Sequence, residues 1–441
     1  MMDESSRASH LVKDAVDPQL GLVSRGIFAD PDVYAIERKR IFERCWLFLG
    51  HESQIEKPGQ YITTKMGETP IILLRDADSK IRAVINSCRH RGNLVTRTDE
   101  GTALTFTCPY HGWCYNVAVK RSQAGQLINV PGLDGYYHGK LARDQWGLVP
   151  VAQVDSYKKL IFGTLDPDAP PLDEYLGDIR WGLNLLLEQG DLAVTPGTAR
   201  WQMNCNWKFA ADNGAGDNAH AEIAHKSAFL TFDKIYNTQP IAPGLQRPGF
   251  TVLTSYGHTL NAQTTGGHKT PGSEWWRQNS DIMQRMGPLR SQVARYNMNI
   301  FPNLFIIDRL LMVRHPINPF KTEIRGIALH DRNAPPDVQQ AEKRNSWRKF
   351  GPSGWLEQED GENWDQSTFG ARIEPLKRHD LNYAMGVGDG EFVDDGQSPP
   401  RIESMINEHG QVWFYRFWAA VMKAEEWTVL QQSQPRPTGR V

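Results

Sequence analysis

The stretches Cys88-Arg89-His90 and Cys108-Pro109-Tyr110-His111 each place one thiol and one imidazole in a short segment. Seventeen residues separate the two segments, which gives the pattern C-x-H-x17-C-x2-H. Cysteine thiolates and histidine nitrogens are ligands that transition metals prefer. The sequence therefore predicts a metal centre held by Cys88, His90, Cys108 and His111, with each loop supplying one Cys and one His.

Two kinds of centre use two Cys and two His. In a Rieske 2Fe–2S cluster, two Cys bind one iron and two His bind the other, which raises the reduction potential above that of all-Cys clusters. Zinc is the alternative, because Cys/His quartets commonly bind it. Zinc fingers usually run Cys, Cys, His, His, whereas each loop here contributes one of each. The pattern favours the iron–sulfur cluster.

The length and charge of the chain limit its class. A chain of 441 residues is too long for a lone cluster carrier and fits two or three domains. The 49 Lys and Arg nearly balance the 51 Asp and Glu, so we expect no nucleic-acid partner. No apolar run approaches the ~20 residues of a membrane span, so we expect no membrane association. Cys45, Cys114 and Cys205 remain besides the cluster ligands, which indicates ordinary thiols in a reducing cytoplasm.

Two kinds of local pattern precede the first loop. Residues 29–50 read as a helix, with Asp30 as its N-cap and Pro31 at its first position, so we expect a helical segment over residues 1–44. From Tyr61 onward, short β-rich runs alternate with turns. We therefore expect a small antiparallel β domain over residues 45–160 that displays both loops.

A proline-containing stretch, Asp166–Leu176, reads as the exit linker to a third region. Beyond it, strands such as Arg200–Asn204 and Leu304–Pro316 mix with helical segments, which is typical of an α+β domain over residues 161–441. Apolar residues at helical spacing between Gln411 and Trp427 predict that one packed amphipathic helix ends the domain.

A second candidate metal site lies at Asp217, His220 and His225, which form D-x2-H-x4-H. Non-haem Fe(II) oxygenases bind iron through two His and one carboxylate and leave positions open for O2 and substrate. At about 100° per residue, the two His of an ideal helix would project about 140° apart, so the helix must end or distort near Ala224. The alternative is a pair of core histidines. The nearby carboxylate and the upstream cluster motif favour a metal site.

The third ligand of such a site should be a distant carboxylate. Residues 354–365 hold five acids, most of which must be solvated charge: Glu357, Glu359, Asp360, Glu362 and Asp365. One further motif, G-x-G-x-x-A at residues 214–219, resembles a nicotinamide-binding signature. Because no apolar strand precedes it and no βαβ unit surrounds it, we expect that this chain itself binds no NAD.

With both sites placed, the chain resembles the large (α) subunits of aromatic-ring-hydroxylating Rieske oxygenases. The resemblance covers nearly the whole chain and rests on RCWLFLGHESQI (44–55), CRHRG (88–92), CPYHGWCYN (108–116), NWKF (206–209) and the D-x2-H-x4-H block (217–225). The chain departs from the family at Ala219, where Tyr is common, and at Cys114, where Ser is common. Neither position is a ligand, although Cys114 could shift the cluster potential through a hydrogen bond near the sulfurs.

The resemblance implies the third iron ligand. In this family it is the last acid of an E-x-[DE]-D cluster that follows a G-P-x-G turn. Residues 351–354 and 357–360 match these two patterns, so Asp360 is implied as the ligand that joins His220 and His225.

The resemblance also implies two catalytic residues beside the iron. Asn213 matches an Asn near the metal. Asp217 matches the acid that links the iron ligand His220 to a Rieske His of the neighbouring subunit, here His111.

The fold and the reaction follow from the same resemblance. The implied fold class is α+β, with a small all-β Rieske iron–sulfur domain and an antiparallel-sheet, helix-grip catalytic domain on which the segment 1–44 packs. The implied cofactors are one 2Fe–2S cluster and one Fe(II) per chain. The implied activity is that of a terminal oxygenase that adds both atoms of O2 to an aromatic ring and forms a cis-dihydrodiol, as in aromatic hydrocarbon catabolism.

Family members of this kind receive electrons from a separate ferredoxin, from an NAD(P)H reductase, or from both. They form rings of three α chains, commonly with three small β subunits, and we expect the same assembly here in the cytoplasm. Two alternatives stay open. One is a Rieske monooxygenase or demethylase with the same metals, and the other is a non-catalytic electron carrier or binding protein, which would have no use for the D-x2-H-x4-H block.

The substrate is the least determined property. Positions that match the family's pocket hold several small side chains, which suggests room for a bulky, multi-ring substrate: Gly214, Ala215, Ala221, Phe350 and Leu356. Against this, Asp308, Arg309, Arg314 and His315 interrupt the otherwise apolar strand 304–316. An Arg there could bind a substrate carboxylate, whereas a solvated strand face or a subunit interface would explain both Arg equally well.

Overall fold

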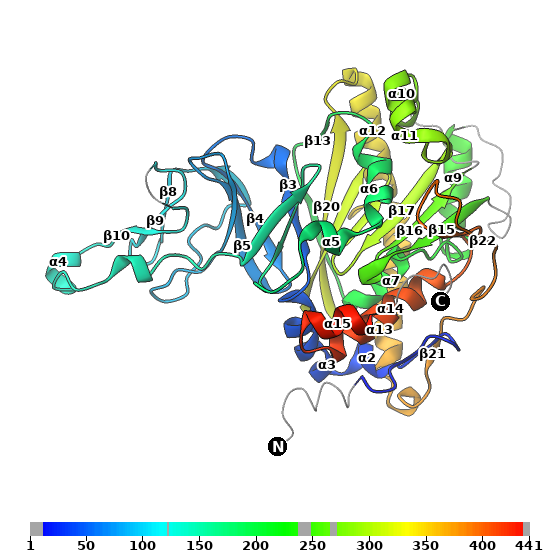
Figure 1. Cartoon of the computed structure of the whole chain (residues 1–441), viewed down its shortest axis with the longest axis horizontal. Helices are drawn as coiled ribbons and strands as arrows, with labels where there is room; N and C mark the ends of the chain where they lie inside the picture. The colour runs from blue at the N-terminus through cyan, green and yellow to red at the C-terminus, as the bar shows by residue number, and fades with distance from the viewer. Residues whose placement is uncertain (1–11, 121–122, 237–247, 265–270, 435–441) are drawn as a thin grey trace. The chain divides into compact units, whose positions relative to one another are not determined.

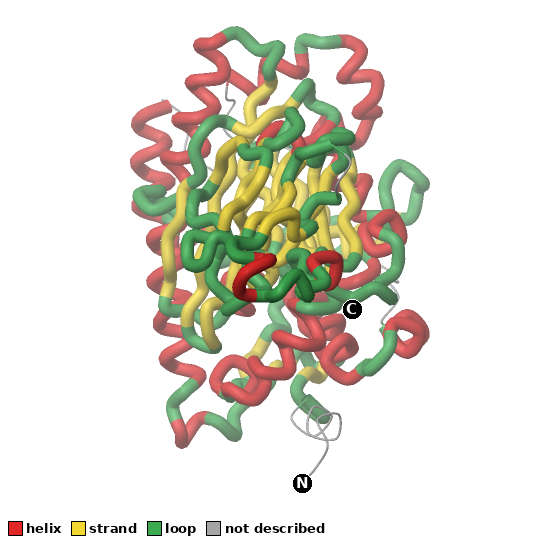
Figure 2. Tube along the Cα trace, turned by 90° about the vertical axis from the view of Figure 1, so that its left-hand side faces the viewer, coloured by secondary structure: helices red, strands yellow, loops and turns green. Residues whose placement is uncertain are grey.

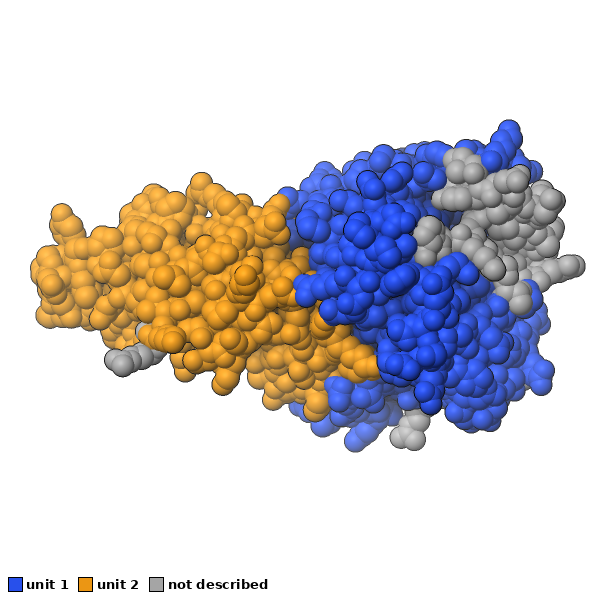
Figure 3. All heavy atoms as spheres, turned by 90° about the horizontal axis from the view of Figure 1, so that it is seen from above, with its two compact units in different colours: residues 1–41, 173–441 blue, residues 42–172 orange. Residues whose placement is uncertain are grey.

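The computed structural model describes residues 12–120, 123–236, 248–264 and 271–434. Residues 1–11, which begin the expected N-terminal helical segment, lie outside the described residues. The chain divides into two compact units, residues 42–172 and residues 1–41 with 173–441, which Figure 3 shows in different colours. No helix in the described part of the chain has the length and hydropathy that a membrane span requires.

The N-terminal helix is shorter than the sequence suggests. Asp30 caps α3 (Pro31–Glu37) by accepting a 2.8 Å hydrogen bond from the backbone of Asp32, and a π-helical turn (Arg38–Phe42) follows. The expectation of one helix over residues 29–50 is wrong beyond Phe42, because Leu47–His51 forms strand β3. Every residue of β3 is buried, and a continuous apolar run fits a strand packed on both faces as well as it fits a helix.

The unit of residues 42–172 is built from three small antiparallel sheets. One joins β3 to β11 (Gln153–Tyr157) and β12 (Leu160–Thr164). The second has four strands in the order β6 (Ile81–Ile85), β5 (Thr69–Arg75), β4 (Gln60–Met66) and β7 (Glu100–Thr102). The third comprises β8 (Thr105–Thr107), β9 (Cys114–Asn116) and β10 (Leu127–Asn129). One Cys/His loop follows β6, and the other connects β8 to β9.

A ten-stranded antiparallel sheet forms the centre of the other unit (Figure 1). Its main path runs β13 (Leu192–Val194), β20 (Lys321–Asp331), β19 (Leu310–Asn318), β18 (Leu304–Ile307), β17 (Arg295–Ile300), β16 (Thr259–Gln263), β15 (Gly249–Leu253), β23 (Arg401–Ile402) and β22 (Phe392–Val393), and β14 (Ala199–Met203) also pairs with β20. The single strand expected over residues 304–316 is in fact the pair β18 and β19, which turn at Asp308, a residue with φ of 51°.

Helices cover both faces of this sheet, and Figure 2 colours them apart from the strands. On one face, a Cβ on Gly182 of α6 (Ile179–Leu187) would touch Leu260 and Met298, so α6 lies directly on β16 and β17. On the other face, α7 (Trp207–Gly214) contacts β17, β18 and β19 and also α13 (Glu357–Ala371). This second face carries the candidate iron site.

The C-terminal residues form two helices and not the one that was predicted. α14 (His409–Lys423) is buried along most of its length, with Trp413 and Trp418 fully enclosed, so it is a core helix. Ala424 adopts an extended conformation with ψ of 128°, which ends α14 before Trp427 begins α15 (Trp427–Ser433). The apolar spacing continues across this break, which is why the pattern alone suggested one helix.

Candidate metal centres

The two Cys/His loops share one backbone design. In the first loop, the N–H of Gly92 donates to the carbonyl of Cys88 over 2.8 Å, and in the second the N–H of Gly112 donates to the carbonyl of Cys108 over 3.0 Å. Both glycines have positive φ, 73° and 72°, a conformation that glycine adopts without steric cost. Each loop therefore turns back on itself tightly and places its Cys and His on the same side.

The four side chains lie where a cluster needs them. The two thiols are 2% exposed and form no disulfide, and the rings of His90 and His111 lie 4.4 Å apart between centroids. Trp113 stacks on His90 at 5.0 Å and fixes the plane of its ring. Nδ1 of His90 is buried without a hydrogen-bond partner, so its lone pair is available to a metal.

Hydrogen-bond donors are directed at both sulfurs. Burial raises the pKa of Cys88, and the hydroxyl of Tyr115, 3.2 Å from its Sγ, partly offsets this effect. Burial also opposes ionisation of Cys108, but hydrogen bonds, chiefly from the backbone N–H of Tyr110, outweigh it and lower the pKa of that thiol. Such donors stabilise a metal-bound thiolate. Tyr115 lies on β9 and was not singled out in the sequence.

The donor set fits a two-iron cluster better than zinc. A zinc ion draws all four ligands to about 2.0–2.3 Å from one point. Among the described residues, only His220, His225 and Asp360 form a group of three or more candidate ligands whose ligating atoms all lie within 4.8 Å of one another. The four side chains of the Cys/His loops are not such a group, and a Rieske cluster divides its two Cys and two His between two irons.

The second site combines side chains from two helical segments that belong to the same unit as the ten-stranded sheet. His220 and His225 flank a single helical turn, α8 (Ala221–Ala224), and His225 leaves helical geometry with φ of −101° and ψ of 16°. This break lets both rings face the same point although they are five residues apart. Asp360 comes from the first turn of α13 and is 5% exposed.

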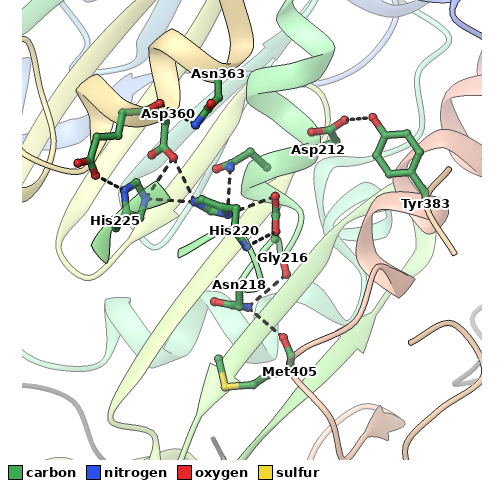
Figure 4. A network of polar contacts seen from close by, with 12 residues as sticks. Asp212, Gly216, Asn218, His220, His225, Asp360, Asn363, Tyr383 and Met405 are labelled. Carbon is green, nitrogen blue, oxygen red and sulfur yellow. Dashed lines mark hydrogen bonds and ion pairs between the residues drawn. The ribbon is translucent and has the colours of Figure 1, made fainter. Parts of the chain in front are cut away.

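The three ligating atoms form a nearly equilateral triangle (Figure 4). Nε2 of His220 lies 3.1 Å from Nε2 of His225, and Oδ1 of Asp360 lies 3.1 Å and 3.2 Å from these two nitrogens. Ligands about 2.1 Å from a metal and at right angles to one another lie about 3.0 Å apart, so the triangle has the size of one face of a metal octahedron. Oδ1 of Asp360 is buried without a hydrogen bond of good geometry, which is also consistent with a ligand atom.

The outer nitrogen of each imidazole faces a carboxylate. Nδ1 of His220 lies 3.2 Å from Asp217 and 3.5 Å from the amide nitrogen of Asn213. Nδ1 of His225 lies 2.8 Å from Glu359, whose other oxygen accepts a 2.7 Å hydrogen bond from Ser227. An N–H···carboxylate contact fixes the tautomer of a ligating His and raises its basicity. The sequence pattern identifies Glu359 only as one of five acids and does not predict its contact with His225.

The charges of the site favour a cation between the three side chains. Burial alone would lower the pKa of His220, but hydrogen bonds and charge from Asp217 and Asp360 outweigh it and raise the pKa to about 10. Burial tends to raise the pKa of Asp360, yet the two imidazoles outweigh this effect and hold that pKa below its ordinary value. A divalent cation would supply the same positive charge with both imidazoles neutral.

A cavity of about 80 Å³ adjoins the three ligands. Its apolar wall comes from the sheet and from the loop before α13, and it includes Phe305, Ile307, Met312, Ile324, Phe350 and Leu356. Its polar wall includes Asn261, Gln263, Arg295, Asn297, Arg314 and Glu357. Glu357 is 1% exposed, and burial together with the nearby Asp360 raises its pKa well above the ordinary value.

The positions matched to the family's pocket have mixed placements. Ala221, Phe350 and Leu356 line the cavity. A Cβ on Gly214 would overlap Nη2 of Arg314 and the ring of Phe305, so the space beside Gly214 is already occupied. The expectation that the small residue at 214 leaves room for a bulky substrate is therefore wrong at that position.

The two strand arginines are not on a solvated face. Arg309 is 5% exposed and pairs with Glu342, and Arg314 is 3% exposed on the cavity wall. The G-x-G-x-x-A motif begins at the last residue of α7 and not after a parallel strand.

Comparison with known proteins agrees with this architecture. Residues 45–150 match the Rieske [2Fe-2S] domain, and residues 172–424 match the catalytic domain of the ring hydroxylating alpha subunit. The chlorobenzene dioxygenase subunit alpha of Cupriavidus sp. (strain PS12) is 33% identical, and the biphenyl dioxygenase subunit alpha of Paraburkholderia xenovorans (strain LB400) is 32% identical, each over 95% of both chains. A solved structure of naphthalene 1,2-dioxygenase with indole bound in the active site superposes with a TM-score of 0.85 at 28% identity, over 95% of this chain and 96% of that one.

These similarities confirm the resemblance and the α+β fold class that the motifs predicted. The catalytic-domain match alone covers more than half of the chain, and the relatives span nearly all of it. The chain belongs to the ring-hydroxylating alpha subunits, the Rieske non-haem iron oxygenases, whose cofactors are a Rieske 2Fe–2S cluster and a mononuclear iron.

Proposed function

We propose that this chain is the terminal oxygenase component of a dioxygenase system, adding both atoms of O2 to neighbouring carbons of an aromatic ring to give a cis-dihydrodiol. The observation that carries the proposal is the triangle of His220, His225 and Asp360 at the wall of a partly apolar cavity. Relatives that are named for benzene and biphenyl dioxygenases support the choice of an aromatic ring.

The residues of the site have separate tasks in this proposal. Fe(II), when bound, supplies the coordination positions at which O2 is activated. His220, His225 and Asp360 would hold the metal beside the cavity that they line. Asp217 and Glu359 accept the Nδ1–H groups and keep both rings in the ligating tautomer. The apolar cavity wall orients the ring and limits the access of water.

The reaction needs two electrons and two protons besides O2 and the arene. We propose that the electrons come from NAD(P)H through a separate reductase, a ferredoxin or both, and enter at the cluster of Cys88, His90, Cys108 and His111. In the proposed assembly, three α chains form a ring, with or without three β subunits, and Asp217 of one chain meets His111 of its neighbour. A reaction that depends on NAD(P)H is expected in the cytoplasm.

We further propose a division of labour along the chain. Residues 45–160 hold the cluster, and the domain proposed over residues 161–441 holds the iron and the substrate, with residues 1–44 packed on that second domain. Residues 161–172 nevertheless lie in the compact unit of residues 42–172, because β12 pairs with β3 and β11. The contacts between α13 and α2 (Gly26–Ala29) support the packing of the first segment.

Isotope labelling tests the reaction directly. The purified oxygenase with a reconstituted electron donor is given an arene and a mixture of 16O2 and 18O2. We expect a diol whose two new oxygen atoms are both 16O or both 18O, because they come from one O2 molecule. A product that carries one atom from O2, or a demethylated product, would instead identify a monooxygenase.

Iron analysis tests the metal content on which the proposal rests. We expect three iron atoms per chain, two in the cluster and one in the mononuclear site. Two iron atoms per chain with no hydroxylated product would indicate an electron carrier.

A further inference from the structure

Arg314 is a buried cation on the cavity wall whose charge is not neutralised by an adjacent carboxylate. It lies on β19, two residues from Met312, and both side chains face the cavity. Its Nη1 donates a 3.0 Å hydrogen bond to Oδ1 of Asn299, and its guanidinium lies 5.2 Å from the centre of the Phe305 ring. In the part of the chain that the structure describes, no carboxylate lies within ion-pair distance of it, and Glu357 acts on it only at longer range.

The neighbouring buried cations, in contrast to Arg314, each pair with a carboxylate. Arg309 pairs with Glu342, and Lys349 pairs with Asp308 over 3.1 Å. Burying an unpaired charge is unfavourable, so buried cations are normally matched in this way. Burial lowers the pKa of Arg314 to about 10, at which the side chain still carries its charge at neutral pH. Arg314 therefore differs from these two cations, because Glu357 and Asp212 act on its charge only at longer range and no carboxylate pairs with it directly.

The neighbouring helix makes room for this guanidinium. Gly214 ends α7 directly against Arg314, and any side chain at 214 would collide with Nη2. The combination of Gly214 and Arg314 puts a rigid, planar donor group into the cavity next to the aromatic ring of Phe305. A guanidinium of this kind matches the two oxygens of a carboxylate.

We infer that the substrate is an aromatic carboxylate whose anionic group binds Arg314 while its ring occupies the apolar part of the cavity. This inference rests on the proposed function and specifies its substrate class. It departs from the neutral hydrocarbons for which the relatives are named. Bound carboxylate would complete the buried ion pair that β19 lacks.

Equilibrium binding to the holoenzyme tests the inference without turnover. Benzoate is compared with benzamide, and 2-naphthoate with 2-naphthamide, because each pair differs in charge but hardly in shape. We expect the carboxylate to bind at least tenfold more tightly than the amide in at least one pair. The measurement is repeated after the mononuclear iron is removed with a chelator, and the preference should persist, because coordination to iron is then impossible. Equal affinities within both pairs, or a preference that disappears with the iron, would overturn the inference.

Variants assign the preference to the guanidinium. Arg314→Gln should weaken carboxylate binding at least tenfold and leave amide binding within about twofold. Gly214→Ala keeps the arginine but displaces it, and it should lower the preference in the same direction. Arg325→Gln removes a neighbouring cation that pairs with Glu323 over 3.1 Å on β20, and it should change neither affinity. If Arg314→Gln and Gly214→Ala both fold and retain the preference, Arg314 is not the binding group.

One further variant addresses Glu357. If Glu357 neutralised Arg314 from a distance, carboxylates would bind selectively only in Glu357→Gln, and that outcome would refute the inference. Labelling with 18O2 remains the separate test of the reaction. An enzyme that dihydroxylates benzene in preference to benzoate would retain the proposed function and disprove the proposed substrate class.

Discussion

At the residue scale, Glu359 and Asp360 are neighbours in the sequence but contact different nitrogens of the iron site. Asp360 faces the Nε2 atoms of both His, whereas Glu359 faces Nδ1 of His225 alone. Because successive residues of an α-helix are rotated by about 100° about its axis, the two side chains project in different directions. The two acids therefore cannot exchange roles without a shift of α13.

Replacing these two acids should separate a ligand from a supporting residue. Asp360→Ala should remove the mononuclear iron and abolish turnover while the visible spectrum of the cluster remains. Glu359→Gln keeps a hydrogen-bond acceptor for His225, so we expect iron to remain and its affinity to fall roughly 10- to 100-fold. Iron analysis and turnover measure both effects. Loss of iron in Glu359→Gln with retention in Asp360→Ala would show that the ligand assignment is displaced by one residue.

Asp217 is predicted to couple the two metals and not to bind either of them. Its carboxylate contacts Nδ1 of His220 and also accepts the backbone N–H of that residue over 3.2 Å. In Asp217→Asn, one acceptor and the charge are lost but the shape is kept. We expect both metals to stay bound and the cluster to stay reducible, while the single-turnover oxidation of the reduced cluster in the presence of substrate and O2 slows by at least about 100-fold. A rate close to that of the unmodified protein would remove Asp217 from the mechanism.

Sequence reasoning identified the proposed ligands but not all of their partners. The spacing of Cys88, His90, Cys108 and His111 predicts a cluster because short loops can bring such ligands together without knowledge of the fold. The choice among the acids of residues 357–365 needed the family's pattern, because spacing alone does not tell which carboxylate turns inward. The pairing of Gly214 with Arg314 joins residues one hundred positions apart, and no local pattern signals it.

At the scale of elements, the two cluster loops depend on one glycine each, but the two glycines have different surroundings. A Cβ on Gly92 would have open space, with its nearest contact at 3.9 Å from Ser87, whereas a Cβ on Gly112 would lie 2.9 Å from Cγ of Pro131. Both substitutions also force a left-handed backbone on a residue with a side chain.

Alanine substitution at these glycines should therefore have graded effects. Gly92→Ala should cost about 1 kcal/mol through its backbone conformation alone. Gly112→Ala should cost more, because it adds the overlap with Pro131. The half-life of the cluster absorbance in mild denaturant measures the difference. Equal half-lives in the two variants would show that the overlap relaxes freely and that only backbone conformation matters.

Errors in the element boundaries have a common physical origin. The sequence predicts a helix over residues 29–50 and one helix from 411 to 427, and in both cases apolar residues at a spacing compatible with a helix continue past the true end of the element. Leu47, Phe48 and Leu49 are buried on both sides of a strand, so they show no alternation of apolar and polar residues. At Ala424 the backbone changes from helical to extended, and no glycine or proline in the sequence predicts this break.

At the scale of the whole molecule, one buried carboxylate ties the N-terminal segment to the catalytic unit. Glu37 on α3 accepts hydrogen bonds from Lys208 over 2.6 Å, from Trp207 over 2.8 Å and from Trp418 over 2.8 Å. Both charged side chains of this cluster are fully buried. This gives a physical reason for the NWKF stretch, because its Trp and Lys both donate hydrogen bonds to Glu37.

Breaking this cluster should destabilise the unit strongly. Lys208→Met leaves Glu37 buried without its charge partner, and we expect a loss of about 3–5 kcal/mol in the free energy of unfolding. Adding Glu37→Gln removes the unpaired buried charge and should recover part of the lost free energy of unfolding. Denaturant unfolding measures both variants. The exposed pair Lys377–Glu374 offers a control, since Lys377→Met should cost less than about 0.5 kcal/mol. A small effect of Lys208→Met, or no recovery in the double variant, would contradict a charge-based role.

The proposed ring of α chains makes a prediction that single-chain enzymes cannot satisfy. If electrons pass from the cluster of one chain to the iron of the next, a chain without a cluster can be served by a neighbour without iron. Cys108→Ser removes a cluster ligand and Asp360→Ala removes an iron ligand, so each variant alone should be inactive. In a ring of three that contains both variants, one interface in three pairs a working cluster with a working iron site, so mixed rings should show about a third of normal activity. Co-expression of differently tagged chains, purification through both tags and turnover assays measure this. Mixed rings that assemble fully but show no activity would place electron transfer within one chain and would refute the role of Asp217 across the subunit boundary.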